Sequence, residues 1–233
     1  MMECAKNITV IVPTLAQYAA LERLFDQLKH YGLDFIAVQA SGETAVLSDG
    51  ASAGDGLWLK APASRGGQIA AGIAHCNTDW IWVLHDDSEL YAQTVEHVLR
   101  VVELGVPRWG RCNVRFKESG WPLRMIAGFM NLRSKLSKIC TGDQGMFFHR
   151  RHLELIGGVP AQPLMEDVEL SKQLKRMAGD DFLPLPAPLG ASGRRWIENG
   201  YAVTILQMWR MRWRYFFGAN ADALFKQYYR RQR

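Results

Sequence analysis

The chain contains little cysteine, and its few cysteines are widely separated. Only four occur among 233 residues, at positions 4, 76, 112 and 140, and none forms a Cys-x-x-Cys pair. Zinc knuckles and redox-active dithiols need paired thiols at short spacing, and small secreted domains use dense disulfides. The cysteine content argues against these classes and favours a reducing, cytoplasmic environment.

Long apolar runs are also missing. Charged residues interrupt every apolar stretch before it reaches about 18 residues, the length that a helix needs to cross a bilayer. Glu3 stands near the start and a strand-like run begins at Ile8, which leaves no space for the basic and apolar parts of a secretory signal. We expect any membrane contact to be peripheral, on the inner membrane face.

Net charge is unevenly distributed along the sequence. The whole chain carries +5, but residues 194–233 hold nine Lys and Arg against two acidic residues, a net +7, which leaves −2 for the remainder. Apolar and charged residues otherwise occur in proportions typical of globular proteins, which argues against disordered and fibrous classes. The length favours one domain with a terminal appendage.

Strand-like and helix-like segments alternate through the first 104 residues. We expect strands at residues 8–12, 35–38, 57–59 and 80–84, and helices at 19–30, 65–76 and 91–104. Such alternation predicts an α/β fold with a doubly wound, mostly parallel sheet flanked by helices. In such sheets, ligands bind outside the carboxyl ends of the strands.

The second half of the sequence has a less regular pattern. Strands are expected at 110–116 and 146–148, a charged helix at 166–177, and an extended segment broken by prolines at 182–189. Residues 123–139 mix apolar and basic side chains, and we assign them no element. No internal repeat or low-complexity linker is present.

Adjacent carboxylates follow the strand expected at 80–84, in the run His85-Asp86-Asp87-Ser88. Repulsion between like charges disfavours ionising both carboxylates unless a cation is near. Oxygen ligands suit Mg²⁺ or Mn²⁺, which often share their coordination with substrate phosphates. The run therefore indicates either a metal site or a solvated turn that caps the next helix.

Two further acidic residues, Glu166 and Asp167, open the helix expected at 166–177. The helix dipole alone favours acids at this position. A positioned carboxylate could also act as a general base that takes the proton of an attacking hydroxyl. The residues themselves leave both interpretations open.

Glycine-containing segments precede two of the expected elements. The segment 65–68 (Arg-Gly-Gly-Gln) begins a helix, where the backbone could approach a ligand and the arginine could meet a diphosphate. The segment 142–145 (Gly-Asp-Gln-Gly) precedes a strand and suits either a tight turn or a loop that lines a site.

Together, these segments resemble the bacterial family 2 glycosyltransferases, which have the GT-A fold, over nearly the whole chain. Residues 8–14 resemble the family's opening strand, residues 65–72 its donor-side helix, and Asp86-Asp87 its metal-binding DxD signature. Residues 142–144, 166–167 and 194–196 resemble its acceptor-side loop, its catalytic-base motif and its RW motif. Residues 131–144 and 164–170 most resemble a branch labelled arsenosugar-biosynthesis glycosyltransferases.

The resemblance implies inverting transfer of a sugar from a nucleoside diphosphate sugar, such as a UDP-sugar, to a hydroxyl of a small molecule, lipid carrier or saccharide. It implies a divalent cation, Mg²⁺ or Mn²⁺, held by Asp87 and His85, and makes Asp167, beside Glu166, the catalytic base. The residues implied for the donor are Pro13, Thr14, Gln39, Ser41, Arg65, Gly66, Asp86 and Asp87. Those implied for the acceptor are Gly142, Asp143, Gln144, Arg195 and Trp196.

The sequence departs from the family at three points. His85 takes the position of the first DxD acid, and no acid occurs near Gln39 and Ser41, where the family contacts the nucleoside. Residues 192–196 (Ser-Gly-Arg-Arg-Trp) replace the QxxRW motif of processive relatives, and their membrane helices are missing. The last difference argues against processive polymer synthesis, whereas the missing acid near Ser41 leaves the recognition of the nucleoside open.

We expect a glycosyltransferase domain at 1–196, with a nucleotide-sugar-binding half at 1–104 and an acceptor-binding half at 105–196. A basic, amphipathic helical segment would follow at 197–233, where aromatic residues alternate with arginines. That segment suits either the headgroup layer of a membrane or packing on the domain. No nucleic-acid-binding motif is recognised, so we expect no nucleic acid partner.

Two other functions compete with glycosyl transfer. A nucleotidyltransferase would use a similar sheet, but the chain lacks an N-terminal, glycine-rich, basic phosphate-binding loop. A catalytically inactive nucleotide-binding or membrane-surface module would explain His85 and the missing acid near Ser41. The presence of Glu166 and Asp167, and of Arg195 and Trp196, argues against loss of activity.

Overall fold

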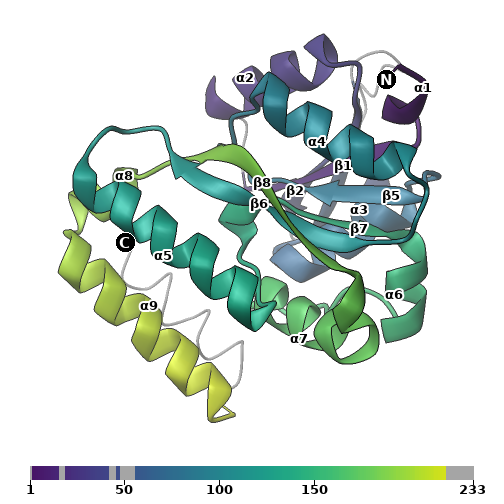
Figure 1. Cartoon of the computed structure of the whole chain (residues 1–233). Helices are drawn as coiled ribbons and strands as arrows, with labels where there is room; N and C mark the ends of the chain where they lie inside the picture. The colour runs from purple at the N-terminus through teal and green to yellow at the C-terminus, as the bar shows by residue number, and fades with distance from the viewer. Residues whose placement is uncertain (1, 16–18, 42–45, 48–55, 219–233) are drawn as a thin grey trace.

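In the computed structural model, which describes residues 2–15, 19–41, 46–47 and 56–218, the chain forms an eight-stranded sheet with helices on both faces (Figure 1). The strands are β1 (Ile8–Thr14), β2 (Asp34–Ser41), β3 (Val46–Leu47), β4 (Leu57–Pro62), β5 (Trp80–Val83), β6 (Trp109–Phe116), β7 (Met146–His149) and β8 (Phe182–Ala191). Their order across the sheet is β3-β4-β2-β1-β5-β7-β6-β8. The helices are α1 (Met2–Ala5), α2 (Ala19–His30), α3 (Arg65–Ala74), α4 (Ala92–Glu103), α5 (Trp121–Ser137), α6 (Arg150–Ile156), α7 (Glu166–Ala178), α8 (Arg194–Glu198) and α9 (Tyr201–Phe216), with short 3₁₀ helices η1 (Gly142–Gln144) and η2 (Gly179–Asp181).

The parallel part of the sheet confirms the predicted alternation of strands and helices. β1 pairs in parallel with β2 and β5, and β2 pairs in parallel with β4. Every residue of β1 and β5 is buried, because helices cover both faces and no strand face meets water. The short strand β3, antiparallel to β4, is an addition that the sequence did not predict.

Alternate side chains of the central strands enter two separate cores. Val10 and Val12 of β1 join a cluster with α2 and α4, whereas Ile11 joins a second cluster with α3, α6 and α7. A strand directs successive side chains to opposite faces, so each continuous apolar run supplies both cores. This arrangement holds the carboxyl ends of the parallel strands at one edge.

The second half of the sheet differs more from expectation. β7 runs antiparallel between β5 and β6, and β8 pairs in parallel with β6 at the end of the sheet. The proline-containing segment is therefore a ten-residue strand, with Pro184, Pro186 and Pro188 at alternate positions. An edge strand tolerates proline because one side of its backbone needs no partner strand. Gly190, also on β8, exchanges two backbone hydrogen bonds with Glu89.

Residues 121–137, to which the sequence assigned no element, form the long helix α5, with Pro122 in its first turn. A third apolar cluster joins α5 to α8 and α9 and includes Phe116 and Trp196. The predicted helical tail is helical as far as Phe216, and residues 219–233 of that prediction lie outside the described residues. None of the described helices combines the length and apolar character that a membrane span requires.

A buried glutamine on α3 ties the ends of two strands together. The Gln68 side chain is only 3% exposed, and its Nε2 donates to the carbonyl oxygens of Thr14 at 2.8 Å and Val38 at 2.6 Å. Thr14 is the last residue of β1, and Val38 lies within β2. Gln68 therefore fixes the edge at which a ligand of such a sheet would bind.

We expect Gln68→Met to lower the free energy of unfolding by about 1–3 kcal/mol, because it leaves buried carbonyls without a donor while keeping a similar volume. Urea denaturation measures the loss. The matched control is Gln93→Met on the exposed surface of α4, which should change stability by less than about 0.5 kcal/mol. Equal stability of the two variants would contradict the structural role of Gln68.

Candidate active site at the carboxyl edge of the sheet

The residues predicted to bind a donor follow neighbouring strands. Pro13 and Thr14 end β1 and pair with Val38 and Gln39 of β2, which continues two residues further to Ser41. Leu84, directly after β5, donates its backbone N–H to Ile11 of β1 at 3.0 Å. Asp86 and the end of β1 therefore lie at the same edge, as predicted.

Arg65, the first residue of α3, is the centre of the polar contacts at this edge. Its Nε lies 2.5 Å from Oε1 of Glu166, the first residue of α7, and its Nη1 lies 3.3 Å from Nδ1 of His85. The Glu166 side chain is only 4% exposed. Burial raises the pKa of Glu166, and the Arg65 guanidinium opposes that shift. The donor-side helix and the predicted base motif are thus joined by one ion pair.

The η1 loop lies directly against these groups. The backbone N–H of Gly142 donates to Oδ2 of Asp167 at 2.8 Å. A methyl group at Gly142 would collide with the His85 ring and stand 2.9 Å from Nη2 of Arg65. Only glycine fits here without displacing those side chains. Arg65, His85, Gly142, Glu166 and Asp167, which the sequence predicted separately, therefore form one cluster.

Asp143 stands beside this cluster with 38% of its side chain exposed, and its Oδ1 lies 3.7 Å from Nε2 of His85. Burial, and after it the charges of Asp87 and Asp167, raise the pKa of Asp143 to about 6. Arg195 lies near enough to oppose this shift. The carboxylates of the predicted donor and acceptor sides are therefore electrostatically linked.

The run at 85–87 has the donor atoms of a metal site. One ligand atom each of His85, Asp86 and Asp87 lies within 4.8 Å of the others. Burial, followed by the charge of Asp86, raises the pKa of Asp87 above its usual range, as expected for crowded carboxylates without a cation. Their oxygens fit Mg²⁺ or Mn²⁺.

His85 fits a metal less well than the two carboxylates. A guanidinium only donates hydrogen bonds, so Nδ1 of His85 accepts from Arg65 and the ring proton lies on Nε2, toward Asp143. Burial, with the charge of Arg65, lowers the pKa of His85 well below its usual value, so the ring is neutral at pH 7. Neither ring nitrogen offers a lone pair to a cation in this arrangement. The geometry favours Asp86 and Asp87 as ligands.

Three predicted site residues have mainly structural contacts. A Cβ atom at Gly66 would collide with the backbone of Pro160 and Gln162, so there is no space for a side chain there. Gln144 is fully buried and bonds within the chain to Thr141, Asn131 and Ser134. Trp196 packs edge-on against Phe116 at 6.0 Å between ring centroids. These residues shape the site's surroundings and expose little surface to a substrate.

Sequence reasoning missed two basic residues near the site. Lys117 directly follows β6, and its Nζ donates to the backbone oxygen of Asp87 at 2.5 Å. Arg133 of α5 is close enough for Asp167 to influence its pKa, which burial lowers. Lys117 could have been found, because it follows a predicted strand as Asp86 does. Arg133 could not, because residues 123–139 had no assigned element.

The backbone is strained next to the acidic pair. Met165, immediately before Glu166, adopts φ 62° and ψ 22°, in the left-handed region. This conformation costs a non-glycine residue about 1–2 kcal/mol. It turns the chain into α7 so that Glu166 reaches Arg65 and Asp167 reaches Gly142.

Comparison with known proteins gave matches of structure only. No family model matches the chain, and no curated protein matches its sequence. S. aureus TarS (residues 1–349) superposes with a TM-score of 0.57 at 12% identity, over 86% of this chain and 64% of that one. The longer TarS structure gives 0.59 at 11% identity, over 87% and 40%. The chain thus spans less than two thirds of these TarS structures.

A second group of matches comes from Mycobacterium tuberculosis. Its glucosyl-3-phosphoglycerate synthase, in complex with Mn²⁺, UDP and glucosyl-3-phosphoglycerate, superposes with a TM-score of 0.53 at 17% identity, over 82% of this chain and 73% of that one. At such identities the likeness establishes the fold and leaves substrates to be argued from the site. The layered sheet, its strand ends and these superpositions together show that this chain has the GT-A fold of glycosyltransferases.

Proposed function

We propose that this protein transfers a sugar from a nucleoside diphosphate sugar to an acceptor hydroxyl, with inversion and with the help of a divalent cation. One observation carries the proposal. At the carboxyl edge of a GT-A sheet, Arg65 and Gly142 contact both His85, which begins the acidic run after β5, and the acids that open α7. This arrangement supplies a place for a cation beside a carboxylate that can accept a proton.

Asp167 is the residue to which we assign the general base. Its oxygens accept backbone hydrogen bonds from Gly142 at 2.8 Å and Val168 at 2.7 Å, which orient the carboxylate and leave further lone pairs. Glu166 is engaged by Arg65 and is almost fully buried, so it suits a positioning role. A held carboxylate can take the proton of a hydroxyl as the hydroxyl attacks the anomeric carbon.

Asp86 and Asp87 would hold the cation, which when bound neutralises charge on a diphosphate leaving group. Arg65 and Lys117 add positive charge beside this pair.

UDP is the favoured nucleotide, since TarS has been crystallised with UDP-GlcNAc and the mycobacterial synthase with UDP and Mn²⁺. We retain residues 1–104 as the donor half and 105–196 as the acceptor half. Membership of the arsenosugar-related branch stays a prediction.

Asp87→Ala should weaken UDP binding in the presence of Mn²⁺ by at least about tenfold, because carboxylate ligands set the affinity for the metal. Isothermal titration calorimetry, with Mn²⁺ or with a chelator, measures the effect. Asp34→Ala changes an exposed carboxylate at the start of β2 and should bind UDP normally. UDP affinity that is the same with Mn²⁺ and with chelator would refute the metal requirement.

Asp167→Asn should reduce single-turnover transfer by about 10²–10⁴-fold, the usual contribution of a general base, while UDP affinity stays within about twofold. Asp180→Asn, at an exposed carboxylate beyond the end of α7, is the control and should transfer normally. Because Asn also loses a backbone hydrogen bond, Asp167→Ala should be tested for rescue by formate. Normal transfer by Asp167→Asn would move the role to Asp143 or Glu166.

Gly142→Ala should destabilise the fold by about 1–3 kcal/mol, since the added methyl group meets His85 and Arg65. Displacement of these groups should also reduce transfer by about 10²-fold. Gly128→Ala is the control: it lies in α5 with no neighbouring atom within 4 Å and should gain about 0.5–1 kcal/mol from helix propensity. Thermal unfolding and transfer assays measure both. If Gly142→Ala behaved like Gly128→Ala, the tight contact would be absent.

A further inference from the structure

Helix α5 carries a stripe of large apolar side chains on its outer face. The stripe consists of Trp121, Met125, Phe129, Leu132 and Leu136, which are 48–74% exposed. Their spacing of three or four residues places them on one side of the helix. The buried residues Leu123, Ile126 and Ala127 lie on the opposite side, against the third apolar cluster. The α5 stripe is therefore about half or more uncovered by the described residues of the domain.

Helix α9 has a similar outer stripe. It consists of Leu206, Trp209, Trp213 and Phe216, with Phe217 directly after the helix, and these residues are 63–76% exposed. Thr204 and Met208 lie on the other side of the helix, toward the domain. Phe217 contacts Trp213 at 5.5 Å and Phe216 at 5.6 Å between ring centroids. These aromatic rings thus pack on one another at the surface of the molecule.

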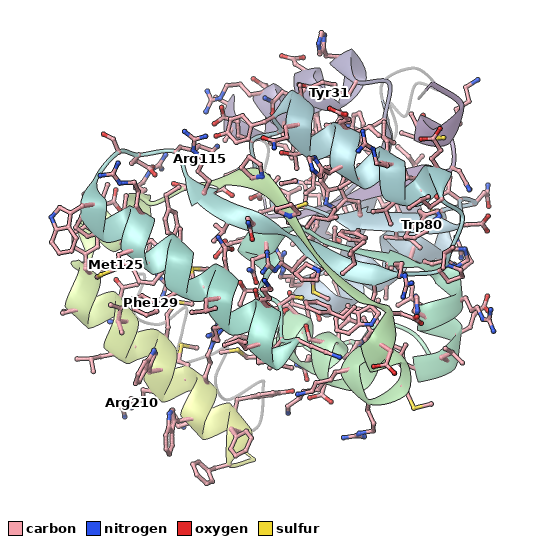
Figure 2. All side chains as sticks on the ribbon, in the orientation of Figure 1. Tyr31, Trp80, Arg115, Met125, Phe129 and Arg210 are labelled. Atoms are coloured by element: carbon pink, nitrogen blue, oxygen red, sulfur yellow. The ribbon has the colours of Figure 1, made fainter. Side chains whose placement is uncertain are left out.

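The two helices lie on the same side of the molecule. They pack around the same apolar cluster, and Figure 1 places both at one side of the sheet, away from α2 and α4. Figure 2 labels Met125 and Phe129 on α5 and Arg210 on α9 in this region. The two stripes together, here named the α5–α9 surface, contain ten large exposed apolar residues. Soluble monomers rarely expose apolar patches of more than a few hundred Å² unless they bind something.

Charge on the α5–α9 surface has a single sign. Neither helix contains an acidic residue. Arg124 and Lys135 flank the α5 stripe, while Arg210 and Arg212 flank the α9 stripe on its two sides. A second copy of the chain would bring the same positive charge against it, which disfavours self-association. Tryptophan and phenylalanine with flanking arginines are typical of helices that lie in a lipid headgroup layer.

We propose that the α5–α9 surface docks onto an anionic lipid bilayer, with both helices lying in the plane of the headgroups. The apolar stripes enter the boundary of the acyl chains, and the flanking arginines and lysine contact anionic headgroups. This proposal goes beyond sugar transfer and does not depend on it. Helix α9 is also tied to α7, because the Tyr215 hydroxyl donates to Oε2 of Glu169 at 2.8 Å. Docking of α9 would therefore fix the position of α7 relative to the bilayer.

Flotation of the full chain with phosphatidylcholine vesicles, with and without phosphatidylglycerol, tests the proposal. We expect recruitment by the anionic vesicles at low salt, weaker recruitment at high salt, and little by the neutral ones.

Trp209→Ser combined with Trp213→Ser should lower the bound fraction at least about tenfold. Arg210→Gln combined with Arg212→Gln should weaken binding by about fivefold for each arginine. The tryptophan emission of the wild type should shift to the blue on binding.

The matched control removes two exposed leucines elsewhere, in Leu104→Ser combined with Leu155→Ser, which are 70% and 49% exposed. This control should float like the wild type, and thermal unfolding should confirm that every variant is folded. Equally poor recruitment of the wild type by both vesicles would overturn the proposal. So would normal flotation of the tryptophan variant. A dimer in solution that the tryptophan changes convert to a monomer would instead make this surface a self-association interface.

Discussion

The ion pair between Arg65 and Glu166 is the contact on which the candidate site depends. It joins the first residues of two helices that are 101 positions apart in sequence, and the carboxylate is almost completely buried. Removing one partner of such a pair leaves an uncompensated charge, at a cost of about 3–5 kcal/mol. The remaining nitrogens of Arg65 then set the orientation of His85 and the space beside Gly142. The Arg65 side chain therefore contacts both His85, which follows β5, and Glu166, which opens α7.

The same contacts place the acids in different surroundings. Glu166 forms an ion pair with Arg65, whereas Asp167 accepts hydrogen bonds from the backbone N–H groups of Gly142 and Val168. Asp86 and Asp87 lie close together, with the charges of Lys117 and Arg65 acting on Asp87, and this crowding of carboxylates favours an added metal ion. The neighbouring His85 contacts Arg65 through Nδ1, and its Nε2 lies 3.7 Å from Oδ1 of Asp143. All of these side chains are carboxylates, so the roles proposed for them differ because of their neighbours and not because of their residue type.

The sequence was sufficient to predict the parallel strands, because uninterrupted apolar runs arise only where helices cover both faces. It also located Asp86 after the end of a strand and Glu166 at the start of a helix. It could not pair Arg65 with Glu166 or detect the close fit of Gly142, since both depend on contacts between distant segments. Helix α5 was missed because its outer face is as apolar as its inner face, which removes the amphipathic period.

The prolines of β8 have a consequence for the behaviour of the molecule in crowded solution. β8 ends the sheet, and the free edge of a long strand is the usual template for pairing with a strand from another molecule. Proline has no N–H group, so three alternate positions of this strand lack the donor that such pairing requires. At its far end the outward backbone groups of Gly190 are already occupied by Glu89. The strand whose composition looked least suited to a sheet thereby protects the molecule from aggregating through that edge.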